Sequence, residues 1–175
     1  MDVANWCELV RKVSRSEFVR IAPMHFLLVF QVDRTTGSRI SFRTTTDPTT
    51  HEPPPLPTSR STYDIRAIVK APGNPYPDRI SVGRALNCDI ALRDATVSKL
   101  HAHILGADPL ALQLVDLGAA NGTYVNSSAL VPNEPRALVR GDVLQFGSVL
   151  CELADAGEAY DVYDAYAPRS VRTGP

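Results

Sequence analysis

Four short motifs in the second half of the chain contain the residues best suited to chemistry. In chain order they are Gly83-Arg84, Ser98-Lys99-Leu100-His101, Asn121-Gly122-Thr123 and Gly141-Asp142. An arginine offers a fixed fork of donors to two phosphate oxygens, and a lysine adds a point charge. A serine hydroxyl and an asparagine amide add neutral donors that shape such a pocket. Together, the motifs predict a site for one phosphate group.

Local charge supports the same prediction. Between Arg79 and His103 four basic residues stand against two acidic residues, whereas the whole chain has a net charge of −1. The near-neutral total argues against bulk nucleic-acid binding, which requires a strong basic excess. The positive stretch coincides with the first two motifs.

Two other kinds of site fit these residues less well. Ser98, His101 and Asp94 could form a nucleophilic triad, but no G-x-S-x-G elbow surrounds Ser98. His101 and His103 alternate on a predicted strand and could chelate zinc from one face. No carboxylate or cysteine pair with ligand spacing accompanies them. We therefore expect no catalytic residue, no metal and no cofactor, and we expect His101 to brace its loop.

The composition is typical of a folded protein outside the membrane. The chain has 175 residues, 44% of them hydrophobic, which is enough for about one domain with a core. No apolar run approaches the roughly 20 residues that span a bilayer, and charged residues interrupt the N-terminal segment. The three cysteines are odd in number and far apart, which favours a reducing compartment. We expect a cytoplasmic protein.

The segment before residue 47 has mixed helix and strand patterns. Apolar residues recur at helical spacing from Val3 to Val13, and Ser14 or Ser16 could cap a second short helix. The apolar run Met24–Val32 predicts a strand buried on both faces, with Arg39–Thr46 returning as the second strand of a hairpin. The next stretch, Asp47–Ser61, is rich in proline and threonine and predicts a linker.

The stretch after the linker alternates short strand patterns with turn residues, without intervening helical patterns. This predicts an antiparallel β-sandwich. The predicted strands are Tyr63–Lys70, Arg79–Gly83, Asp89–Leu92, His101–Leu105, Ala111–Asp116, Thr123–Asn126, Arg136–Val139, Val143–Phe146 and Leu150–Leu153.

The last segment is acidic and carries three tyrosines at a spacing of three residues. That spacing could be one helical face, but we prefer a mobile tail. The predicted organisation is an N-terminal extension (1–46), a linker (47–61), a β-sandwich domain (62–154) and an acidic, tyrosine-bearing tail (155–175).

The motifs of the sandwich region occur in a familiar order and spacing. The segments Ile80–Leu92, Asp94–Ile104, Leu114–Asn126 and Arg140–Gly147 resemble the forkhead-associated (FHA) domain. The resemblance covers about Tyr63–Leu153. It implies a sandwich of two antiparallel sheets that binds phosphothreonine peptides through loops at one end.

The resemblance also implies a role for each motif residue. Arg84 and Ser98 match positions that contact phosphate, and Lys99 follows at a position that often adds another contact. Asn121 matches the residue that holds the peptide backbone beside the phosphothreonine. The residues that match loop-shaping positions, which do not touch the ligand, are Gly83, His101 and Gly122.

One position departs from the family pattern. Ala120 stands where the family often has a serine or threonine that helps to hold the ligand. A lost neutral hydrogen bond costs about 0.5–1.5 kcal/mol, whereas the charge-assisted contact of Arg84 contributes about 1.5–3 kcal/mol. We therefore expect weaker binding rather than none.

Two functions remain open at this stage. The first is a non-catalytic phosphothreonine-peptide-binding adaptor in Ser/Thr kinase signalling, whose partner is a kinase or a phosphorylated protein. The alternative is a structural or assembly module that does not require phosphate, which Ala120 and the extra hairpin favour. Phosphorylated threonines between Thr44 and Thr62 could also dock into the same domain, in cis or in a second copy.

Overall fold

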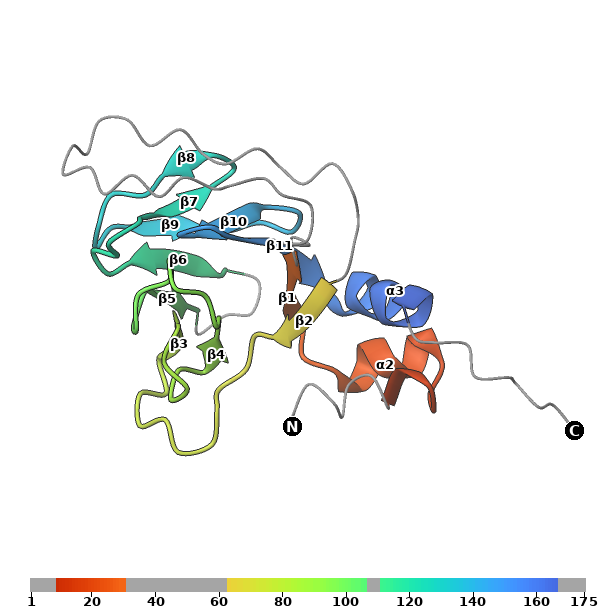
Figure 1. Ribbon diagram of the computed structural model, residues 1–175. Coiled ribbons are helices and arrows are strands. Elements are labelled where there is room, and N and C mark those ends of the chain that lie inside the picture. Colours follow the sequence, from red (N-terminus) through yellow and green to blue (C-terminus); the bar gives the residue numbers. More distant parts are fainter. Residues whose placement is uncertain (1–8, 31–62, 107–110, 167–175) are drawn as a thin grey trace, which may run out of the picture.

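Two stacked β-sheets form the centre of the computed structural model, which describes residues 9–30, 63–106 and 111–166 (Figure 1). The strands of the first sheet, in spatial order, are β2 (Tyr63–Ala67), β1 (His25–Phe30), β11 (Val149–Asp155), β10 (Val143–Phe146), β7 (Thr123–Val125) and β8 (Ser128–Ala129). Those of the second sheet are β4 (Ile90–Ala91), β3 (Arg79–Gly83), β5 (Ala102–Leu105), β6 (Gln113–Asp116) and β9 (Pro135–Ala137). The predicted mainly β sandwich is confirmed.

The strand pairing is antiparallel with one exception among the described strands. β4 runs parallel to β3, with Val82 opposite Ile90. The short strand β8 was not predicted from the sequence. It contains two exposed residues after a turn in which Asn126 and Ser127 have positive φ angles of 50° and 66°, so it has no alternation of apolar and polar residues that a pattern search could detect.

The main core lies between the two sheets. It contains Leu27, Leu144 and Phe146 from the first sheet and Ile104 and Leu114 from the second, all at most 1% exposed. Every other residue of a strand faces this core, because successive side chains point to opposite faces of a sheet. The core supports the loops that join the strands at the ends of the sandwich.

Strand β1 is buried on both faces, as its continuous apolar run predicted. Leu27 and Val29 belong to the main core, whereas Phe26 and Leu28 belong to a second apolar cluster on the outer face of the sheet. β1 pairs with β2 on one side and with β11 on the other. The predicted return strand Arg39–Thr46 lies outside the described residues.

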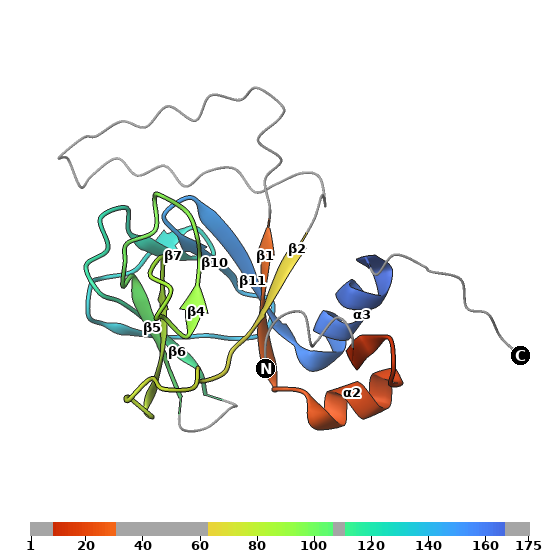
Figure 2. The same cartoon turned by 60° about the horizontal axis from the view of Figure 1, so that its bottom comes forward.

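Two helices cover the outer face of β1 (Figures 1 and 2). In α2 (Arg15–Ile21) the N-cap is Ser14, one of the two predicted candidates, and its side chain accepts a hydrogen bond from the Glu17 amide. Phe18 of α2 is fully buried, with its ring centroid 6.2 Å from that of Phe26. The short helix thus depends on packing more than on its own length.

The second helix corrects the prediction of a mobile C-terminal tail. Residues Ala156–Tyr166 form α3, which starts directly after β11. At its N-terminus the Asp155 carboxylate accepts from the Glu158 amide, and the Glu158 carboxylate accepts from the Asp155 amide, which is a reciprocal capping box. Tyr163 is 6% exposed in the second cluster, so the tyrosine spacing marks a helical face.

Ion pairing joins the two helices. The Arg15 guanidinium donates from Nε and Nη2 to the two carboxylate oxygens of Asp161, at 2.8 and 3.0 Å. This bidentate pair connects residues 146 positions apart in the sequence. The helix α2, which precedes most of the strands in the sequence, and the helix α3, which follows them, thus pack together on the first sheet.

Candidate functional site

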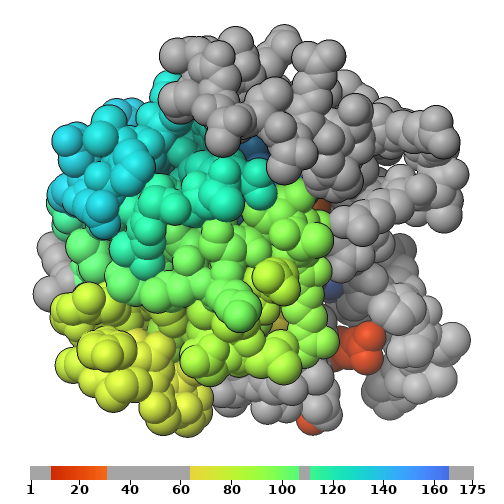
Figure 3. Space-filling model, turned by 60° about the vertical axis from the view of Figure 1, so that its left-hand side comes forward, coloured from red at the N-terminus to blue at the C-terminus, as the bar shows by residue number. Residues whose placement is uncertain are grey.

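Three loops of the sandwich contact one another and carry the predicted site residues except Gly83, which ends β3. We call them the site loops: residues 84–89 between β3 and β4, residues 92–101 between β4 and β5, and residues 117–122 between β6 and β7. On the face shown in Figure 3, the yellow-green to green part of the chain, which includes the first two loops, borders the teal part that begins near the third loop. The hydrogen bonds below define how the loops meet.

Arg84 is joined to the second site loop through its backbone and its side chain. Its amide donates to the Ser98 carbonyl at 2.9 Å, and its Nε donates to the Val97 carbonyl at 3.1 Å. The side chain is exposed, and its two Nη groups make no hydrogen bond to the described residues. The guanidinium is thus held at one nitrogen and open to a ligand at the other two.

Gly83 permits this close approach. A Cβ atom at this position would lie 2.4 Å from the carbonyl oxygen of Lys99, which is backbone and cannot rotate away. The Ala85 amide donates to that same carbonyl at 3.1 Å. The first two site loops therefore contact each other through a position that only glycine can occupy without displacing them.

Ser98 links the second site loop to the third. Its Oγ accepts a hydrogen bond from the Ala120 amide at 3.3 Å, so the hydroxyl hydrogen can still be donated to a phosphate oxygen. Ala120 lacks a hydroxyl, and its backbone amide nevertheless keeps the link to Ser98. The departure from the family pattern thus leaves the contact between the loops intact.

His101 braces the base of the site. It is completely buried, its Nδ1 accepts from the Ser98 amide at 3.0 Å, and its Nε2 lies 3.1 Å from the Gly122 carbonyl. An amide donor on Nδ1 requires the neutral ring with its proton on Nε2, which donates to Gly122. Burial lowers the pKa of His101, and the hydrogen bond to Gly122 only partly offsets this effect. The ring packs edge-on against Phe146, with centroids 5.7 Å apart.

Asn121 and Lys99 complete the predicted set. The Nδ2 of Asn121 donates to the Thr96 carbonyl at 2.8 Å, which ties the tip of the third loop to the second. Gly122, which follows, has a φ of +66°, a conformation that favours glycine. The Lys99 side chain is exposed beside the loop contact that its carbonyl makes. The structure thus places six of the seven predicted residues in the three loops, and Gly83 at the end of β3, directly before the first loop.

The cations of the site loops differ in pairing from most others. Side chains elsewhere in the described residues form ion pairs, namely Arg15–Asp161, Arg20–Glu17, Arg66–Asp64, Lys70–Asp89, Arg79–Asp78 and Arg140–Asp155. Arg84, Arg93 and Lys99 are exposed and form no ion pair with a described residue. Cations on adjacent loops that have no carboxylate partner among the described residues attract an anionic ligand.

Several buried polar residues that support the site were not singled out from the sequence. Asp116 is 2% exposed, and its carboxylate accepts from the Thr123 hydroxyl and from the amides of Gly118 and Ala119. It therefore fixes the start of the third loop. The sequence pattern that could have identified Asp116 is Asp116-Leu117-Gly118, which is typical of an Asx turn.

The geometry also bears on the two alternatives raised by the sequence, a nucleophilic triad and a zinc site. Ser98 contacts His101 through its backbone amide rather than its hydroxyl, and both ring nitrogens of His101 are engaged within the protein. His103 instead lines a hollow of about 320 Å³ on the outer face of the second sheet, together with Arg79 and Val115. Within residues 9–30, 63–106 and 111–166, no three His, Cys, Asp or Glu side chains lie close enough to hold a metal.

The described helices are all too short or too polar to cross a bilayer.

Comparisons with known proteins agree with the fold and the motifs. Residues 80–147 match the family model of the FHA domain. The glycogen accumulation regulator GarA of Mycolicibacterium smegmatis is 42% identical over 69 residues, which cover 38% of this chain and 40% of the relative. The oxoglutarate dehydrogenase inhibitor of Corynebacterium diphtheriae is 40% identical over 67 residues, which cover 38% of this chain and 44% of the relative.

A solved structure is similar as well. The FHA domain of the CT664 protein from Chlamydia trachomatis is 28% identical, covering 44% of this chain and 76% of that one, with a TM-score of 0.41. The two curated relatives are matched over less than half of their lengths. The similarity to the FHA domain family thus rests on residues 80–147, which match its family model.

Proposed function

We propose that the chain is a non-catalytic adaptor that binds phosphothreonine peptides through the site loops. Arg84, Ser98 and Lys99 hold the phosphate, and Asn121 holds the peptide backbone beside it. The observation that carries the proposal is that all four residues lie on the short segment 96–99 or hydrogen-bond to it. Charged and neutral phosphate donors therefore converge on one place on the surface.

The charges at the site favour a phosphorylated peptide as the ligand. Arg84 and Lys99 have no carboxylate partner among the described residues, so an incoming phosphate does not compete with an internal ion pair. A charge-assisted hydrogen bond contributes about 1.5–3 kcal/mol. Because association itself is costly, a small interface of this kind gives a Kd on the order of micromolar. We expect the partner to be a Ser/Thr kinase or its substrate, in the cytoplasm.

The proposal is tested by calorimetry with a library of phosphothreonine peptides and their unphosphorylated forms. We expect phosphate-dependent binding that Arg84→Ala weakens on the order of 10- to 100-fold. Arg79→Ala is the matched control, since Arg79 is paired with Asp78 and lies on the same sheet outside the site loops. Wild-type protein that binds no peptide in a phosphate-dependent way supports the phosphate-independent assembly module instead.

The threonines of the predicted linker form a further part of the proposal. Phe30 at the end of β1 pairs with Tyr63 at the start of β2, so the connecting segment leaves and re-enters the sheet at one place. The antiparallel register of β1 with β11 puts Phe30 near the β10–β11 turn, and Ser148 of that turn contacts Thr96 of a site loop. A phosphothreonine between Thr44 and Thr62 is therefore within reach of the site, given about 3.3 Å per extended residue.

A further inference from the structure

Thr96 is the meeting point of three segments at the site. Its hydroxyl donates to the Asp94 carboxylate at 2.7 Å, because an ionised carboxylate can only accept. The same oxygen accepts from the Ser148 amide at 2.9 Å and lies 2.9 Å from the Ser148 hydroxyl, which also lies 3.4 Å from the Asp94 carboxylate. The Thr96 carbonyl accepts from Nδ2 of Asn121 at 2.8 Å. One residue thus connects the second site loop, the third site loop and the β10–β11 turn.

The β10–β11 turn lies tightly against Thr96. A Cβ atom on Gly147 would lie 2.6 Å from the Thr96 carbonyl oxygen and 2.8 Å from its hydroxyl oxygen, and the φ of Gly147 is +59°. The Gly147 amide also donates to the Gly122 carbonyl at 3.2 Å. The turn therefore fixes both the acceptor of the Asn121 side chain and the residue next to Asn121.

Asn121 depends on this arrangement because it is exposed. It lies at a loop tip, and the bond to Thr96 is the one hydrogen bond of its side chain to a described residue. If the Thr96 carbonyl moves, Asn121 loses the bond that sets its side-chain direction. Arg84 is held by different carbonyls, those of Val97 and Ser98. The phosphate contacts and the backbone contact are thus supported separately.

We propose that Thr96, anchored by Asp94 and Ser148, is the positioning residue that orients Asn121 toward the peptide backbone. It acts through Asn121 rather than through a contact with the ligand, and the inference rests on the proposed function. Its consequence is selective: loss of the Thr96 hydroxyl reduces binding of a peptide and spares binding of the phosphate group. Neither the motifs nor the family match assigns such a role to Thr96.

The test is a double-mutant cycle with Thr96→Val and Asn121→Ala. The probes are the tightest phosphothreonine peptide from the calorimetric screen and the free amino acid phosphothreonine, which lacks a flanking backbone. We expect Thr96→Val to weaken the peptide about 10-fold in the wild-type background and less than about 2-fold when Asn121 is already alanine. Binding of free phosphothreonine, followed by NMR titration, changes less than about 2-fold.

Control variants separate positioning from general destabilisation. Thr96→Ser keeps the hydroxyl and restores peptide binding to within about 2-fold of wild type. Ser148→Ala removes the hydroxyl contacts to Thr96 and Asp94 but keeps the hydrogen bond from the Ser148 amide to Thr96. If Thr96→Val does not fold, the same cycle is completed with this milder variant. Its loss of peptide affinity, about 3-fold, must also vanish in the Asn121→Ala background.

The outcomes distinguish this inference from the proposed function. Peptide binding that Arg84→Ala abolishes, with losses from Thr96 and Asn121 that multiply independently, overturns the positioning role and leaves the adaptor intact. Equal loss of peptide and free phosphothreonine also overturns it. A wild-type chain that binds neither probe overturns the adaptor and the positioning role together.

Discussion

Asp89 shows how one buried carboxylate organises the approach to the site. Its side chain is fully buried and accepts hydrogen bonds from five donors. They are the amides of Ala71 and Ser81, the Ser81 hydroxyl, the Asn74 amide group and the Lys70 ammonium. Burial raises the pKa of Asp89, but these hydrogen bonds outweigh burial and the net pKa is lowered. The ionised form is therefore part of the folded structure.

Asp89→Asn is expected to lower the free energy of unfolding by about 2–4 kcal/mol, because an amide group replaces one acceptor with a donor. Since the folded pKa is lowered, the contribution of Asp89 is present above its unfolded pKa of about 3.9 and is lost as pH falls through the folded value. Urea denaturation between about pH 7 and about pH 3 should therefore show a smaller acid destabilisation in the variant. Asp78→Asn is the control: its ion pair with Arg79 is exposed, so it should change the acid destabilisation only slightly. Identical midpoints for Asp89→Asn and wild type at neutral pH contradict this account.

His101 and His103 provide a second comparison at the residue scale. Both lie close together at β5, but His101 is completely buried and bonded at both nitrogens, whereas His103 is half-buried on the outer face. His101→Ala leaves a cavity and leaves the Ser98 amide without its acceptor, so we expect a loss of about 3–5 kcal/mol in unfolding free energy. His103→Ala should cost less than about 1 kcal/mol. Chemical denaturation measures both, and comparable losses would show that His101 does not brace the loops.

The two helices are the elements that sequence patterns predicted least completely. Ser14 was recognisable as a helix cap, and the tyrosine spacing was recognisable as one helical face. What decides that α3 forms is its contact with Phe18 and Phe26, which lie more than a hundred residues earlier in the sequence. A short acidic helix is marginal by itself, so its formation depends on tertiary packing that no local pattern contains.

Phe18 tests the packing of these elements. Phe18→Ala removes a fully buried ring that contacts both Phe26 and Tyr160, and we expect a loss of about 3–5 kcal/mol in unfolding free energy. Val19→Ala, at the next and 44% exposed position, should change it by less than about 0.5 kcal/mol. Guanidinium denaturation of the full chain makes the comparison. If the two variants unfold at the same midpoint, α2 does not pack as described.

The residues of the site loops could be picked out from the sequence because their signals are local. Gly83-Arg84, Ser98-Lys99 and Asn121-Gly122 are local signals, because each pair combines a donor with a backbone constraint at a turn. The role of Thr96 was missed because its partner Ser148 is 52 positions away. Contacts between loops depend on the sandwich that brings their ends together, and single motifs do not encode this arrangement.

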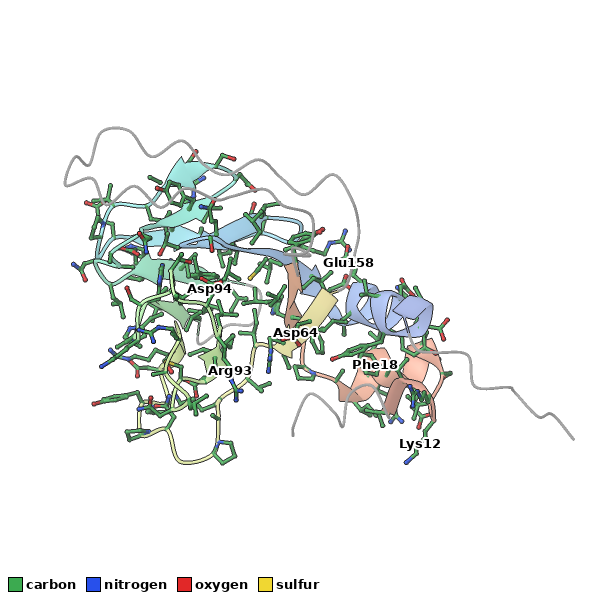
Figure 4. All side chains as sticks on the ribbon, viewed as in Figure 1. Lys12, Phe18, Asp64, Arg93, Asp94 and Glu158 are labelled. Carbon is green, nitrogen blue, oxygen red and sulfur yellow. The ribbon has the colours of Figure 1, made fainter. Side chains whose placement is uncertain are left out.

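At the scale of the whole molecule, the two helices and the site loops belong to different parts of the structure. The helices pack on the outer face of the first sheet at β1, whereas the site loops extend from the second sheet and from the β6–β7 connection (Figure 4). Arg93 and Asp94 in one site loop and Phe18 in α2 are labelled in that view. The net charge of −1 is a sum over the whole chain. It shows that the molecule as a whole is not basic, but it does not describe the local charge at the site.

Self-docking is the prediction that belongs to this scale. If a phosphothreonine between Thr44 and Thr62 occupies the site in cis, kinase-treated protein should bind an external phosphopeptide at least about 10-fold more weakly than untreated protein. Its sedimentation should remain that of a single chain, whereas docking in trans produces a dimer. Arg84→Ala should abolish either effect. Phosphorylated protein with unchanged size and unchanged peptide affinity would contradict self-docking.

The most direct test of the central claim is an NMR titration of the full chain with a phosphothreonine peptide. We expect the backbone amide shifts to concentrate at Arg84, Ser98, Lys99, Asn121 and their neighbours, with no shifts from the unphosphorylated peptide. Shifts confined to the outer face of the second sheet around His103 and Val115, or equal shifts from both peptides, would contradict the assignment of the site loops as a phosphothreonine-binding site.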